Sequence, residues 1–70
     1  MECRDDVISI GKEILGRDLT EDEINELTNA MEERYNLYHE MYDEDVDIEA
    51  LFNEDFHDAL KENMEEMGLL

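Results

Sequence analysis

Apolar side chains recur every three or four residues between residues 24 and 42, which is the spacing of one face of an α-helix. Thr20 and Glu23, just before this stripe, match a capping box. Leu19 and Ile24 match the hydrophobic staple that often accompanies such a box. These signals predict a helix over residues 21–42, about 33 Å long at 1.5 Å per residue. Its apolar face consists of Ile24, Leu27, Met31, Tyr35, Tyr38 and Tyr42, widened by Ala30, Leu37 and Met41.

Two further helices are predicted on either side. The first spans residues 4–15 and ends at Gly16; its apolar side is Val7, Ile8, Ile14 and Leu15. The other spans residues 47–67 and ends at Gly68, with Asp45 or Asp47 as its cap; its apolar face is Ile48, Phe52, Phe56, Ala59, Leu60, Met64 and Met67. No segment shows strand alternation. We therefore expect an all-α fold, a three-helix bundle in one domain over residues 1–70, with a long antiparallel hairpin of the second and third helices.

A chain of 70 residues buries a thin core and usually needs additional support. The single cysteine, Cys3, excludes an internal disulfide and is interpreted as an incidental thiol in a reducing, cytoplasmic setting. The tyrosines suit a partly wet boundary. They fit either an ordinary core edge or a homodimer that completes the core, and we expect the homodimer. Its candidate core or dimer face is Tyr35, Tyr38, Phe52 and Phe56.

Several function classes find no support in the sequence. No stretch approaches the roughly 20 apolar residues of a membrane span, and the opening "MECRDD" is too acidic for a signal peptide. There is no GxGxxG, P-loop or GxSxG motif, and His39 and His57 do not form a HExxH-type pair. We expect a soluble cytoplasmic protein that is not an enzyme and has no cofactor.

Residues 41–54, "MYDEDVDIEALFNE", contain the spacing of an EF-hand calcium loop. Asp43, Asp45, Asp47 and Glu54 occupy ligand positions 1, 3, 5 and 12. Ile48, however, stands where the loop needs a glycine, and Ala50 stands where an aliphatic residue normally pairs two loops. The apolar spacing from Ile48 onward instead predicts a helix. A surface His39 is also favoured over a loose zinc site with Asp43, so we expect no metal.

The net charge of −18 is the dominant compositional feature. It excludes unaided binding to nucleic acid or to an anionic membrane. The charge grows along the chain: residues 1–19 sum to −2, residues 20–42 to −6 and residues 43–70 to −10. Acidic side chains spaced by four residues lie about 6 Å apart and repel each other, which costs stability in a small domain. We interpret this uncompensated charge as a surface for a positively charged partner.

The predicted partner-binding surface combines a row on each long helix with the turn between them. Its acidic residues are Asp22, Glu26, Glu33, Glu40, Asp43, Glu44, Asp45, Asp47, Glu49, Glu54, Asp58, Glu62 and Glu65. Carboxylates in such rows are spaced like phosphates along a nucleic-acid strand. Charge alone is promiscuous, so apolar anchors would add specificity, and the candidates are Tyr42 and Leu51.

Acidic rows such as "NEDFHDALKENMEEM", together with size and charge, make the last two-thirds of the chain resemble the small acidic DNA-mimic inhibitor proteins. Many of these are made by bacteriophages against host DNA-binding proteins. They share no common fold or motif, so the resemblance assigns a role to no individual residue. It implies that the chain occupies the DNA-binding surface of a basic protein, in the host bacterial cytoplasm if phage-encoded, and blocks DNA access.

An HU-type nucleoid protein is the first candidate target. Such proteins grip the DNA backbone and read little sequence, and a dimeric mimic would match their dimer symmetry. Two alternatives stay open. One is a small helical adaptor or regulatory module that binds through an apolar helix face. The other is an immunity or antitoxin protein that covers a basic nuclease.

Overall fold

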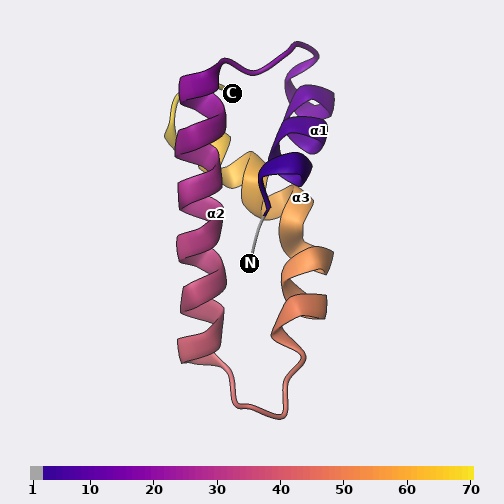
Figure 1. The fold of residues 1–70 in the computed structure, drawn as a ribbon, viewed down its shortest axis with the longest axis vertical. Helices are drawn as coiled ribbons and strands as arrows, with labels where there is room; N and C mark the ends of the chain where they lie inside the picture. Colours follow the sequence, from indigo (N-terminus) through magenta and orange to yellow (C-terminus); the bar gives the residue numbers. More distant parts are fainter. Residues whose placement is uncertain (1–2) are drawn as a thin grey trace.

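The computed structural model describes residues 3–70 and contains three helices (Figure 1). Helix α1 spans Arg4–Leu15, α2 spans Glu21–Met41 and α3 spans Ile48–Glu66. Helices α2 and α3 form a long antiparallel hairpin, and α1 packs on both of them at the end remote from the turn (Figure 1). No strand occurs in the described part of the chain. The predicted all-α three-helix bundle is confirmed, and the predicted helix boundaries are correct to within one residue.

The helix ends follow the predicted local chemistry. At the start of α2 the Glu23 N–H donates to Thr20 Oγ1 at 3.2 Å and the Thr20 N–H donates to Glu23 Oε1 at 2.8 Å, which completes the capping box. Asp47 caps α3 by accepting the Ala50 N–H at 3.2 Å. Gly16 ends α1 in the left-handed conformation, with φ of 72°.

The last turn of α3 closes with two backbone hydrogen bonds. The Gly68 N–H donates to the Glu65 carbonyl at 3.1 Å, and the Leu69 N–H donates to the Met64 carbonyl at 2.9 Å. This pattern is a Schellman motif, and the φ of 80° at Gly68 is the left-handed residue that it needs.

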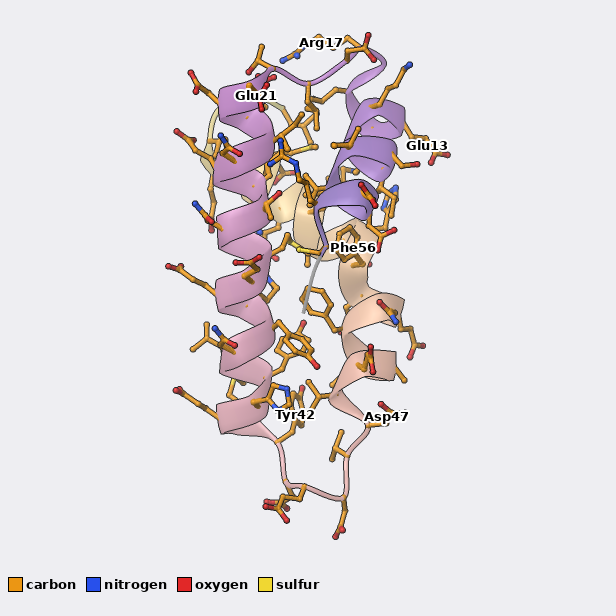
Figure 2. All side chains as sticks on the ribbon, viewed as in Figure 1. Glu13, Arg17, Glu21, Tyr42, Asp47 and Phe56 are labelled. Atoms are coloured by element: carbon orange, nitrogen blue, oxygen red, sulfur yellow. The ribbon has the colours of Figure 1, made fainter. Side chains whose placement is uncertain are left out.

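The core lies along the axis between the three helices. Its largest fully buried side chains are Phe52, Leu27, Met31, Leu60, Met64 and Val7. Phe52 and Phe56 are buried, and Phe56 lies between the helices in Figure 2, while Tyr35 and Tyr38 are half-buried against the same cluster. These four residues therefore contribute to the core of a single chain, and the homodimer remains a prediction.

Burial on α1 differs from the sequence expectation. Ile8 is exposed, so its place on the apolar side was wrong, whereas Ile10 and Gly11 lie against the core. Gly11 sits where α1 approaches the rest of the molecule closely: a Cβ there would lie 2.6 Å from Leu19 Cδ1 and 3.1 Å from Met64 Cε. The register of α1 is therefore determined by where its backbone can approach its neighbours.

Cys3 is also buried, with 2% of its surface exposed, so its interpretation as an incidental thiol was wrong. It packs in the core cluster beside α2, with its Sγ 4.0 Å from the carbonyl oxygen of Thr28. Burial raises the pKa of the thiol, and the neighbouring carboxylates of Glu32 and Asp6 raise it further. The residue is a small apolar core side chain that joins the start of α1 to α2.

On α2 the apolar stripe is wider than the surface that the other helices cover. Leu37 and Met41 are 52% and 70% exposed, although both were assigned to the widened apolar face.

None of the helices of residues 3–70 is both long and apolar enough to cross a bilayer.

Candidate functional site

All the acidic residues of the predicted partner-binding surface are exposed. On α2 the row formed by Asp22, Glu26, Glu33 and Glu40 lies on the side of the helix opposite its buried residues, since each residue turns the helix by about 100°. On α3 the same holds for Glu54, Asp58 and Glu65. The helices bury their inner faces against each other, so the two rows face away from each other on different sides of an elongated body.

The two rows meet at the hairpin turn. Tyr42 and Asp47 flank this turn in Figure 2, at the end of the molecule opposite Arg17 and Glu21. Between residues 35 and 55 there is neither lysine nor arginine, and the carboxylates are Glu40, Asp43, Glu44, Asp45, Asp47, Glu49, Glu54 and Asp55. The hairpin end is therefore the most strongly negative part of the described chain.

A pocket of about 370 Å³ opens at this hairpin end. Its walls combine rings and carboxylates, from Tyr35, His39, Tyr42, Asp43, Glu44, Val46, Asp47, Ile48 and Glu49. The Tyr35 and His39 rings meet edge to face at 4.8 Å. Electron-rich ring faces beside carboxylates are favourable surroundings for an ammonium or guanidinium group.

The calcium-like window has the geometry of a turn followed by a helix. The Val46 N–H donates to the Asp43 carbonyl at 3.1 Å in the turn, and Asp47 uses a carboxylate oxygen to cap α3. Residues 48–54 are helical, as their apolar spacing predicted, so Glu54 stands in the second turn of α3. Among residues 3–70 no three His, Cys, Asp or Glu side chains gather closely enough to hold a metal ion.

Basic side chains offset part of the negative charge at the opposite end of the molecule. Arg4 contacts Glu21 at 3.3 Å, Lys12 contacts Asp18 at 3.1 Å and Arg17 contacts Glu23 at 2.8 Å. Each of these pairs involves α1 or the segment that joins α1 to α2. The positive charge is thus concentrated away from the hairpin end.

The Arg17–Glu23 pair is the best-formed of these contacts. Arg17 donates through both Nη atoms to the two carboxylate oxygens of Glu23, at 3.0 and 2.8 Å. This hydrogen bonding, aided by the Thr20 N–H, lowers the pKa of Glu23 from 4.5 to about 2. Glu23 therefore has a local structural role and stands apart from the unpaired acidic rows.

One ion pair crosses the hairpin. Arg34 of α2 contacts Glu62 of α3 at 3.5 Å, with the Arg34 side chain 27% exposed. Glu62 is thus the one member of the predicted acidic surface that contacts a lysine or arginine within the described residues. Of the remaining members, Asp47 caps α3 and Asp58 lies 3.8 Å from His57 Nδ1.

The two predicted apolar anchors are placed differently. Tyr42 is 41% exposed at the mouth of the hairpin-end pocket, with its ring edge to face against Tyr38 at 5.8 Å. Leu51 is only partly exposed. A second groove, of about 440 Å³, lies between α2 and α3 and is lined by Ala30, Glu33, Arg34, Leu37, Tyr38, Met41, Asn63 and Glu66.

This α2–α3 groove was missed because Leu37 and Met41 were assigned to the covered face. A helical projection contains the signal that could have found it. Relative to Met31, Leu37 and Met41 lie about 120° and 80° round the helix, at one edge of the stripe, whereas Leu27 and Tyr35 lie within about 40°.

Comparisons of this chain with protein-family models, with curated proteins and with solved structures find no match.

Proposed function

We propose that this chain is an acidic inhibitor that occupies the DNA-binding surface of a basic protein and so blocks DNA access. The single observation that carries the proposal is the density of negative charge along the molecule. The Cα positions span 38 × 19 × 17 Å. A DNA duplex 38 Å long carries about 22 phosphates at one per 1.7 Å.

The number of carboxylates in the chain matches that number of phosphates. The chain has 23 acidic residues, of which only Glu2 lies outside the described part, so 22 carboxylates belong to residues 3–70. The five basic residues offset some of this charge, four of them through ion pairs. The net charge of residues 3–70 is −17, so the elongated bundle carries about three-quarters of the linear charge of double-stranded DNA.

The arrangement of the carboxylates supports the same proposal. Exposed rows on different sides of the bundle offer charge to a protein that wraps around it, as the two strands of a duplex do. Within the α3 row, Glu54 and Asp58 are separated by about 6 Å along the axis. The hairpin-end pocket adds aromatic walls beside the carboxylates, where one lysine or arginine of the partner would be held.

An HU-type nucleoid protein is the first target to test, because it binds DNA through backbone charge and reads little sequence. We would titrate it with the chain by isothermal calorimetry and then add a DNA duplex as competitor. Binding should be displaced by the duplex and should weaken at least about tenfold between roughly 50 and 200 mM NaCl. To test the immunity-protein alternative, the chain is added to a basic nuclease and the loss of DNA cleavage is measured.

A charge-matched pair of variants separates a shaped surface from bulk charge. Glu54→Lys, Asp58→Lys and Glu65→Lys together reverse the α3 row while sparing Glu62, which contacts Arg34. The control reverses three exposed carboxylates of α1, namely Asp5, Asp6 and Glu13, with the same change in net charge. The α3 variant should lose binding and the α1 variant should keep most of it. Equal losses, or binding by the α3 variant at wild-type strength, would refute the proposed surface.

A further inference from the structure

The α2–α3 groove is an apolar surface beside an acidic row. Leu37 and Met41 are more than half exposed, and Ala30 and Tyr38 continue the apolar wall. Below it, Asn63 donates from Nδ2 to Met31 Sδ at 3.2 Å, which closes the groove against the core. Methionine is flexible and polarisable, so Met41 can adapt to the shape of an incoming side chain.

The charge around this groove is negative. Glu33 and Glu66 line it, and Glu40 lies on the adjacent side of α2. Arg34 is the one basic residue in the lining, and its guanidinium is already engaged by Glu62 at 3.5 Å. A side chain that enters the groove therefore has unpaired carboxylates on both sides.

This charge pattern indicates what kind of molecule the groove can bind. A second copy of the chain, with its own net charge of −18, would bring like charges together around the groove. A partner segment with apolar residues along one face and lysine or arginine at its edges would instead bury its apolar face while its cations meet Glu33 and Glu66. Charge complementarity thus favours a basic amphipathic segment.

We propose that the α2–α3 groove binds an apolar side chain carried by a basic amphipathic segment of the partner protein, with Leu37 and Met41 as the contact residues. The inference deepens the proposed function, on which it rests for the partner's positive charge. It assigns selectivity to the groove, since rows of carboxylates attract basic proteins in general, whereas an apolar side chain must fit a particular site.

The test uses two synthetic peptides of about 18 residues, or five helical turns. The Leu/Lys peptide carries leucine at helical i, i+3, i+4 and i+7 spacing and lysine elsewhere; in the Ser/Lys peptide serine replaces each leucine. Fluorescence anisotropy of labelled peptide gives the Kd for each. At roughly 0.5 M NaCl, where charge is heavily screened, the Leu/Lys peptide should bind at least about tenfold more tightly than the Ser/Lys peptide.

The groove variant combines Leu37→Ser with Met41→Ser, and its fold is checked by circular dichroism. It should lose at least about tenfold in affinity for the Leu/Lys peptide, with the Ser/Lys peptide unaffected. The matched control combines Ile8→Ser with Leu70→Ser, two apolar residues of 37% and 51% exposure outside both the groove and the hairpin-end pocket, and should bind like the wild type. Wild-type affinity in the groove variant, or an equal loss in the control, would overturn the inference.

Three further outcomes are diagnostic. If sedimentation shows a wild-type dimer that the groove variant dissociates, the groove is filled by a second copy and the inference is wrong. If the peptide results hold while no basic DNA-binding protein binds the chain, the groove stands and the proposed DNA mimicry fails. If both peptides bind alike and the α3 charge-reversal variant loses the HU-type protein, the proposed function stands without the groove.

Discussion

Replacing Phe52 by alanine tests whether the hairpin is held by its aromatic cluster. Phe52 is 1% exposed, and its ring packs edge to face against Tyr35 at 5.2 Å, Phe56 at 5.6 Å and Tyr38 at 5.9 Å. It therefore joins both long helices in the half of the hairpin that α1 does not cover. Few other contacts are available there to compensate for its loss.

The expected loss is large relative to the stability of the domain. Truncating a buried phenylalanine to alanine costs about 3–5 kcal/mol, and the half-buried tyrosines allow some collapse into the space, so we expect about 4 kcal/mol. A domain of 70 residues has a free energy of unfolding of roughly 4–10 kcal/mol, at about 0.05–0.15 kcal/mol per residue. The expected loss is therefore between about two-fifths and the whole of that free energy of unfolding.

Urea unfolding followed by far-ultraviolet circular dichroism measures this loss. Leu37→Ala, on the same hairpin but half-exposed, is the control and should cost less than about 1 kcal/mol. If Phe52→Ala has no folded baseline, Phe52→Leu should still fold and lose about 1–1.5 kcal/mol. A loss below about 2 kcal/mol for Phe52→Ala, or one equal to that of Leu37→Ala, would show that the cluster does not hold the hairpin.

Three further predictions concern the helix cap, one titrating group and the net charge. Thr20→Ala removes the side-chain half of the capping box and should lower the free energy of unfolding by about 1 kcal/mol in urea titrations; no change would mean that α2 does not need its cap. Arg17→Gln should raise the pKa of Glu23 from about 2 toward its ordinary 4.5, as followed by NMR. Because the folded pKa is the lower one, the stabilisation by this pair is present above pH 4.5 and is lost as pH falls through about 2, whereas the variant should lack that loss. Added NaCl should raise Tm at pH 7, because it screens the repulsion within a chain of net charge −18; a Tm that falls would contradict this balance.

The helices could be predicted from the sequence because their signals are local. Each signal acts on residues within a few positions of itself. The Thr20–Glu23 capping box and the Asp47 cap begin helices, Gly16 and Gly68 end them, and the structure uses each as predicted. The exposure of the acidic rows was predictable for a related reason, since unpaired carboxylates stay in water.

Burial at the edges of the apolar stripes was only partly predictable. A helical projection places Leu37 and Met41 at an edge of the α2 stripe, but which edge stays uncovered depends on where α1 docks. Leu37 and Met41 are exposed because α1 docks on the opposite side of α2, where Arg4 contacts Asn25 and Glu21. Ile8 is exposed because Gly11, with no side chain, is the point at which α1 approaches Leu19 and Met64. The meeting of aromatic and acidic side chains at the hairpin end likewise depends on the path of the turn.

The burial of Cys3 makes its thiol a built-in reporter of how often α1 opens. It is the only thiol of the chain, it is the residue that precedes α1, and solvent reaches it when the start of α1 moves away from α2. The rate at which an alkylating reagent modifies it therefore counts openings of α1, without any engineered label. Comparing that rate with the rate of global unfolding would show whether α1 detaches by itself while the acidic hairpin stays folded.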